Sequence, residues 1–132
     1  MSENSDLSKA SPSRAKSFEE LVVWQRARAL TKEIYSVTRV GRFRLDSGLA
    51  HQAQRASVSI MANIAEGFDR RGVGEFAHFL GYAKSSCAEL RSHLYVALDT
   101  ECIAPEEFER LKADCRQLSL TIQKLIDSLR SR

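Results

Sequence analysis

Apolar residues recur at alternating spacings of three and four along most of this chain, the pattern of helices that bury one face. The first such stripe consists of Val23, Ala27, Leu30, Ile34 and Val37. Ser17 and Glu20 form a capping-box pattern at its start, in which each side chain accepts a hydrogen bond from the other residue's backbone N–H. We therefore expect the first helix to begin near residue 18 and to end before Gly41.

Three further helices follow in the same pattern. The second is predicted over residues 47–68, with Asp46 or Ser47 as its N-cap and Gly67 near its end. The third and fourth each have seven stripe positions: Phe76, Leu80, Ala83, Cys87, Leu90, Leu94 and Ala97, then Phe108, Leu111, Cys115, Leu118, Ile122, Leu125 and Leu129. Pro105 suits the first turn of the last helix, because the N–H that proline lacks has no partner there.

The spacing and the short connections together predict an all-α fold. Sustained 3.5-residue repeats favour packing at shallow angles with left-handed supercoiling, and short connections make neighbours antiparallel. We expect one domain over residues 17–132, an antiparallel up-down-up-down four-helix bundle with a left-handed twist. Residues 1–16 are rich in serine and charge and are expected to form a flexible tail.

The composition of the chain indicates in which compartment we expect the protein. No apolar run approaches the roughly 18–20 residues needed to span a bilayer, and the first residues lack the apolar segment of a signal peptide. Three cysteines, at 87, 102 and 115, are odd in number and show no CxxC pairing. These features favour the reducing cytoplasm and no membrane partner.

The second helix has unusually little charge. From Gly48 to Ala65 the only charged residue is Arg55, although 28% of the chain is charged. One apolar stripe of this helix, formed by Leu49, Ala53, Ala56 and Ile60, is expected to face the core. The opposite side is also apolar and consists of Val58, Met61, Ala62 and Ala65. A helix that is apolar on both sides is buried on both, so we expect a second copy of the chain to cover this surface.

A polar stripe lies beside the predicted core face of the same helix. It consists of Gln52, Arg55, Ser59, Asn63 and Glu66. Arg55 and Glu66 could pair across copies of the chain, or Arg55 could pair with Glu89 of the third helix, because buried charges persist only when paired. The favoured interpretation is a polar network that fixes the register of packed helices; a ligand-binding or catalytic site is the alternative.

Several stretches resemble the 23S rRNA intervening sequence protein family. The resemblance spans residues 18–129 and rests on FEELVVWQRARALTKEIYSVT in the first helix, GLAHQAQRASVSIMANIAEGFDR in the second and FLGYAKSSCAELRSHL in the third. Its most specific part is NIAEG with Gln52 and Arg55 upstream. The resemblance implies a cytosolic four-helix bundle that assembles as a ring-like homopentamer. The chain is also similar to the pentameric accessory protein of diversity-generating retroelements, which binds nucleic acid and a reverse transcriptase.

Residues that could do chemistry do not form a recognisable catalytic set. EFAH supplies a single ExxH pair, Glu75 and His78, whereas a di-iron bundle needs two such pairs and two further glutamates. Cys87 and Cys115 occupy core positions, and Glu101 beside Cys102 would raise the pKa of that thiol. We therefore expect no catalytic residue, no cofactor, no metal and no small-molecule substrate.

Nucleic acid is the favoured partner besides the chain itself. The antiparallel arrangement predicts that one end of the bundle gathers six basic residues: Arg14, Lys16, Arg70, Arg71, Arg130 and Arg132. The net charge of +3 becomes roughly fifteen in a pentamer, which favours contacts with phosphate groups. The predicted function is a non-enzymatic homo-oligomeric scaffold that binds RNA or DNA. An adaptor that docks a protein in the central opening of the oligomer is the alternative, and an enzyme acting at Arg55, Asn63, Glu66 and Glu89 comes third.

Overall fold

The computed structural model describes residues 14–131, so most of the predicted tail and Arg132 lie outside the described residues. Its regular structure is entirely helical, which confirms the all-α prediction for this part of the chain. The elements in order are the 3₁₀ helix η1 (Phe18–Glu20) and the α-helices α2 (Val22–Thr38), α3 (Gly41–Leu45), α4 (Ser47–Asp69), α5 (Val73–Asp99) and α6 (Pro105–Arg130). None of these helices is both long enough and apolar enough to cross a membrane.

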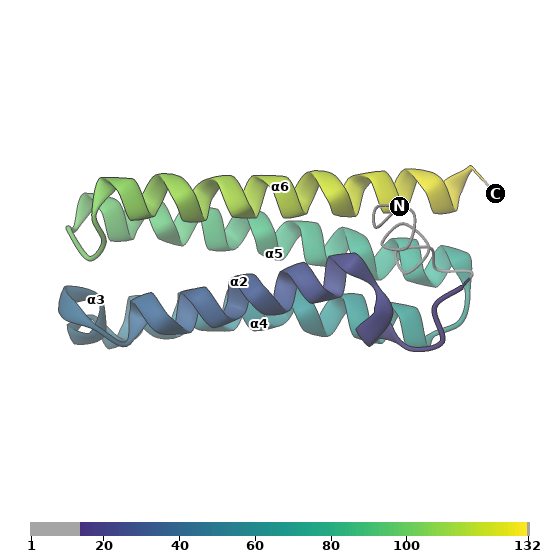
Figure 1. The fold of residues 1–132 in the computed structure, drawn as a ribbon, viewed down its shortest axis with the longest axis horizontal. Coiled ribbons are helices and arrows are strands. Elements are labelled where there is room, and N and C mark those ends of the chain that lie inside the picture. Colours follow the sequence, from purple (N-terminus) through teal and green to yellow (C-terminus); the bar gives the residue numbers. More distant parts are fainter. Residues whose placement is uncertain (1–13, 132) are drawn as a thin grey trace, which may run out of the picture.

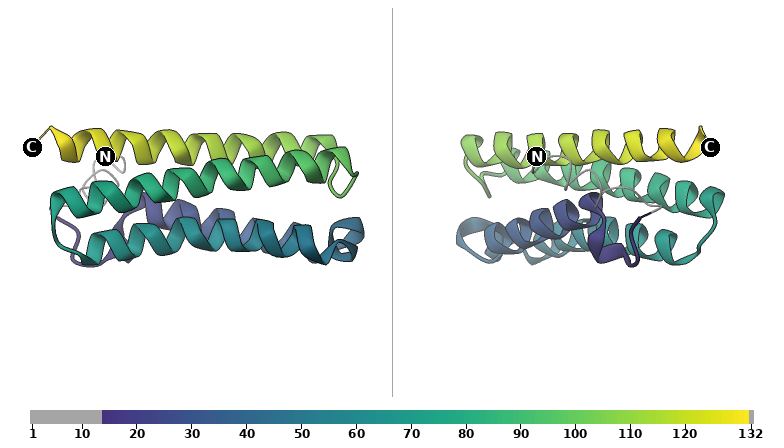
Figure 2. Two further views of the ribbon diagram at one scale, coloured as in Figure 1. Left: turned by 180° about the vertical axis from the view of Figure 1, so that it is seen from behind. Right: turned by 45° about the vertical axis from the view of Figure 1, so that its right-hand side comes forward.

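The four long helices lie side by side along the long axis of the molecule (Figure 1). The chain reverses direction between successive long helices, and a view from behind shows α4 and α5 together on that face (Figure 2). Packing is most extensive between α4 and α5, then between α5 and α6, then between α2 and α4, and least extensive between α2 and α6. Each long helix thus has two neighbours, and α4 lies diagonally across from α6.

The predicted core positions are buried in α2 and α5, and the predicted core stripe of α4 is buried as well. One position of the α6 stripe differs, because Leu125 is only half-buried while the adjacent Ile126 is 3% exposed. Arg26 of α2 donates a hydrogen bond to Thr121 of α6. Leu125 lies one turn beyond Thr121, level with the start of α2, and still packs against the core although Ile126 is the more deeply buried residue.

The predicted capping box at the start of the first helix is wrong. Ser17 makes no side-chain cap hydrogen bond, and the chain forms one turn of 3₁₀ helix before α2 begins. Leu21 separates the two helices in an extended conformation and is fully buried, while Phe18 packs edge-on against Trp24 with ring centroids 5.2 Å apart. Burial of these apolar side chains interrupts the helix between η1 and α2. Gln25 Nε2 donates a hydrogen bond to the Glu19 carbonyl at this interruption.

The connections combine expected and unexpected features. Asp46 is the N-cap of α4, as one of the two predicted alternatives, and its Oδ1 accepts a hydrogen bond from the Leu49 backbone N–H at 3.1 Å. The short helix α3 was not predicted; it buries Phe43 completely and begins at Gly41, whose φ of 59° is easily adopted by glycine. Pro105 lies in the first turn of α6, as expected.

The close approach of α4 and α5 depends on a glycine. A Cβ atom added to Gly67 would lie 2.5 Å from the Cβ of Phe79 and 3.2 Å from a ring carbon of Phe76. No side chain can occupy this position without separating the two helices. Gly67 therefore sets the distance between the most extensively packed pair of helices.

We expect Gly67→Ala to lower the free energy of unfolding by about 1–3 kcal/mol, because overpacking a tight contact forces the helices apart. Gly81→Ala is the matched control within α5. An added Cβ there meets no atom within 4 Å, so the higher helix propensity of alanine should stabilise the protein by about 1 kcal/mol. Urea denaturation measures both changes, and equal stability of the two variants would contradict this account of Gly67.

Candidate functional site

The outward side of α4 is only partly open in the isolated chain. Val58 is 42% exposed and Ala62 is exposed, so both are accessible in the single chain. Met61 and Ala65 are instead half-buried, and Met61 packs against the core of its own subunit. The apolar surface available to another copy of the chain is therefore centred on Val58 and Ala62.

Part of the predicted polar stripe joins α4 to α5. The hydroxyl oxygens of Ser59 and Ser86 are 2.8 Å apart, at hydrogen-bond distance. Asn63 Nδ2 donates to the Ser59 carbonyl at 2.8 Å and lies 3.1 Å from the Ser59 hydroxyl. These small polar groups satisfy one another within the subunit, and this cluster stabilises the α4–α5 register without a partner chain.

The charged members of the stripe do not pair with one another within the single chain. Glu66 pairs with Arg70 one turn along α4, at 3.2 Å, and Glu89 lies 3.8 Å from His93. Arg55 and Gln52 are exposed, and Arg55 has no hydrogen bond or ion pair with any residue in the described range 14–131. Within one subunit Arg55 thus pairs with neither carboxylate, and its pairing across copies stays a prediction.

His93 of α5 has a buried ring nitrogen to which the sequence pattern assigned no role. Its Nε2 is buried without a hydrogen-bond partner, and Glu89 Oε2 at 3.8 Å is too far away to accept a hydrogen bond. Only the structure reveals this position, because burial of the ring nitrogen depends on how the helices pack and not on the spacing of residues along α5.

The predicted basic end is assembled, but carboxylates neutralise part of it. The α4–α5 turn, the start of the described chain and the end of α6 lie at the same end of the molecule (Figure 1). Arg14, Lys16, Arg71 and Arg130 are exposed there. Arg70, in contrast, pairs with Glu66 at 3.2 Å and with Glu75 at 3.8 Å, and its guanidinium lies 4.9 Å from the centre of the Phe79 ring. Arg132 lies outside the described residues.

Other basic residues, which the sequence analysis left unassigned, gather along α5 and α6. Lys84 and Arg91 are seven residues apart on α5, and Lys112, Arg116 and Arg130 follow at spacings of four and fourteen on α6. Multiples of seven and steps of four keep residues on one side of a helix, so the signal is present in the sequence. It becomes visible only when the two helices are known to be neighbours.

The two core cysteines are protected from reaction. Burial raises the pKa of the Cys87 thiol to about 12. Burial also raises the pKa of Cys115 to about 12, and the neighbouring Cys87 and Asp114 act in the same direction. Both thiols therefore stay protonated at neutral pH, whereas the thiolate is the nucleophilic form.

The ExxH residues are engaged in other contacts. Glu75 pairs with Arg70, and His78 Nε2 lies 2.8 Å from the Tyr82 hydroxyl. Within residues 14–131, no group of three or more histidine, cysteine, aspartate or glutamate side chains is placed to hold a metal ion. The structure thus brings no further ligand to this pair.

The fold and these surfaces define a small helical protein whose long helices pack side by side. Residues 19–124 match the family described as 23S rRNA-intervening sequence protein, and the chain belongs to this family. This match confirms the resemblance drawn from the sequence. Comparison with curated protein sequences finds no significant match.

A solved structure supports the fold. The chain is similar to a crystal structure from Bacteroides thetaiotaomicron, described as a protein with unknown function from the S23 ribosomal protein family. The TM-score is 0.72 at 22% sequence identity, and the match covers 80% of this chain and 98% of the other. At this identity the likeness concerns the fold alone.

We expect thiol reagents at pH 8 to label one cysteine per folded chain. Cys102 is half-buried near the surface, whereas Cys87 and Cys115 are buried and have pKa values of about 12. All three should react in denaturant, where Cys87 and Cys115 become exposed and their pKa values return to about 8.5. Mass spectrometry identifies the labelled positions, and rapid labelling of Cys87 in the folded protein would contradict this burial.

Proposed function

We propose that this chain is a non-enzymatic scaffold whose four long helices form a left-handed up-down-up-down bundle, and that it assembles in the cytoplasm as a homopentamer that binds RNA or DNA. The observation that favours assembly is the distribution of charge between diagonal helices. The only charged residues of α4 are Arg55, Glu66 and Asp69. The subunit number rests on the resemblance to the family.

The exposed apolar side of α4 supports self-association. Val58 and Ala62 lie on a helix whose other sides already pack against α2 and α5. Alanine at position 62 permits a close approach of a helix from another copy. Covering this surface also gives Arg55 a setting in which it can find a partner, which it lacks among the described residues of one subunit.

Two facts support nucleic acid as the external partner. The net charge of +3 is multiplied by assembly, so that even modest basic surfaces produce a strong field. The family description also associates these proteins with intervening sequences in 23S rRNA. The fold offers helices whose side chains can contact phosphate groups, and contacts of this kind position a protein on nucleic acid without reading its sequence.

Substitutions on the outer side of α4 test the assembly. Light scattering should give a mass of five times 14.9 kDa for the unaltered protein. Val58→Arg and Ala62→Glu should each lower the mass toward that of one chain, because a charge buried in an apolar interface without a partner is costly. Both residues are accessible in the single subunit, so the variants are expected to fold.

Leu120→Arg is the matched control for the assembly test. Leu120 is 57% exposed, but it lies on α6, diagonally across the bundle from α4. The mass of the Leu120→Arg variant should equal that of the unaltered protein. A monomeric mass for the unaltered protein at micromolar concentration would overturn the proposed assembly, and so would unchanged masses for both α4 variants.

Binding of nucleic acid is tested by fluorescence anisotropy with labelled RNA and DNA strands. We expect binding at 50 mM salt and a loss of at least tenfold in affinity at 200 mM, because phosphate contacts release counterions. Absence of binding to both strands at 50 mM salt would overturn this part of the proposed function.

A further inference from the structure

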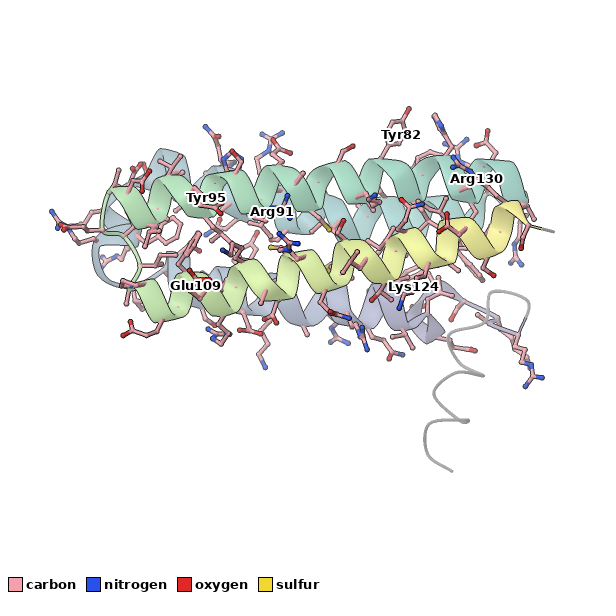
Figure 3. The ribbon with its side chains drawn as sticks, turned by 90° about the horizontal axis from the view of Figure 1, so that it is seen from above. Tyr82, Arg91, Tyr95, Glu109, Lys124 and Arg130 are labelled. Atoms are coloured by element: carbon pink, nitrogen blue, oxygen red, sulfur yellow. The ribbon has the colours of Figure 1, made fainter. Side chains whose placement is uncertain are left out.

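A row of basic side chains follows the line along which α5 and α6 meet. We call Lys84, Arg91, Lys112, Arg116 and Arg130, with Tyr95, the α5–α6 seam. Lys84 Nζ donates a hydrogen bond to Gln123 Oε1 at 2.7 Å, which places this side of α5 against α6. Figure 3 shows Arg91 and Tyr95 between the two helices and Arg130 toward the end of α6.

Few carboxylates oppose these charges. Lys112 Nζ is 3.3 Å from Glu109 Oε1, and Asp127 accepts a hydrogen bond from Gln123 Nε2. Lys84, Arg91, Arg116 and Arg130 have no ion pair within residues 14–131. Arg91 is notable because it is half-buried as well as unpaired, and a cation in that position favours an anionic ligand.

The cations of the seam have fewer carboxylate partners than Arg70 at the basic end. At the basic end Arg70 already has two carboxylate partners, Glu66 and Glu75. Only Arg130 belongs to both surfaces. The seam cations Lys84, Arg91, Arg116 and Arg130 have no such carboxylate partner within residues 14–131, so their charge is available to an external anion.

Tyr95 favours a nucleic acid strand over an acidic protein segment. Its side chain is 47% exposed, and its ring packs edge-on against Phe108 with centroids 4.8 Å apart. The Lys112 ammonium group lies 5.8 Å from the centre of the Tyr95 ring. A fixed aromatic ring with one open side, flanked by cations, is suited to stack a base while the cations contact phosphates.

The length of the seam also suits an extended strand. Lys112 and Arg130 are 18 residues apart on one helix, which corresponds to about 27 Å. One strand of a duplex has a phosphate about every 3.4 Å along the axis, so a more extended single strand also places several phosphates within this length. Several phosphates can thus be contacted at once along one straight surface.

We propose that the α5–α6 seam binds single-stranded RNA or DNA, with Arg91, Arg116 and Arg130 contacting phosphates and Tyr95 stacking on a base. The proposal rests on the proposed function and specifies its surface. The seam lies on α5 and α6 and does not include Val58 or Ala62, the α4 residues assigned to contact between copies.

The test compares two triple variants of the full chain that remove the same charge. Arg91→Gln/Arg116→Gln/Arg130→Gln alters the seam, and Arg28→Gln/Lys32→Gln/Arg44→Gln alters α2 and α3. Anisotropy is measured with 20-nucleotide RNA and DNA strands between 50 and 200 mM salt. The seam variant should lose at least tenfold in affinity and about two units of the slope of log K against log salt. The control variant should stay within twofold of the unaltered protein.

Arg91 is half-buried, so a second variant avoids it. Arg116→Glu/Arg130→Glu changes two exposed residues and should also lose at least tenfold in affinity, with unchanged helical circular dichroism. Equal losses for the seam and control variants would overturn the seam while leaving nucleic-acid binding in place. Failure of the unaltered protein to bind either strand would overturn the proposed function itself.

A tyrosine pair tests the stacking contact. Tyr82 is 48% exposed on the same helix but points away from the seam, so Tyr82→Ala is the control for Tyr95→Ala (Figure 3). Tyr95→Ala should lose about fivefold or more in affinity, and Tyr95→Phe should retain it. Equal effects of the two alanine variants would overturn the stacking role. Displacement of the strand by poly-glutamate at equal charge would assign the seam to acidic protein segments and overturn the nucleic-acid proposal.

Discussion

The contact between the backbone of α4 at Gly67 and the side chain of Phe79 on α5 sets the geometry of the whole molecule. It brings the two helices close enough for Ser59 to reach Ser86. The polar groups between α4 and α5 therefore form hydrogen bonds with one another. α5 also packs extensively against α6. One side of α5 then faces α4, and the side that includes Lys84 and Arg91 faces α6.

The consequence is a subunit with two chemically different sides. The outer surface of α4 has few charges and two accessible apolar residues, Val58 and Ala62. Its diagonal neighbour α6 has ten charged residues, at positions 106, 107, 109, 110, 112, 114, 116, 124, 127 and 130. Five of these charges are basic and five are acidic, and the basic residues 112, 116 and 130 belong to the seam. In the proposed function, contact between copies and contact with nucleic acid therefore use different helices.

The stripes of apolar residues predicted the helices and nearly all of the core, because helix periodicity is local and repeats over seven positions in α5 and α6. Features that depend on neighbours were missed. Burial of Leu21 prevents the capping box predicted at Ser17, and Ile126 is buried in place of Leu125 near the start of α2. Features of the candidate site that depend on neighbouring helices were missed as well. Carboxylates from two helices neutralise Arg70, and the basic row appears only when α5 and α6 are placed in register.

The limited packing of α2 has a dynamic consequence. This helix has 17 residues, against 23 in α4, 27 in α5 and 26 in α6, and its boundary with α6 is the least extensive of the four. Parts of a protein with fewer buried contacts open at a lower free energy than the whole. The first helix is therefore the segment that detaches most easily, and its sub-global opening leaves α4, α5 and α6 together as a three-helix remnant.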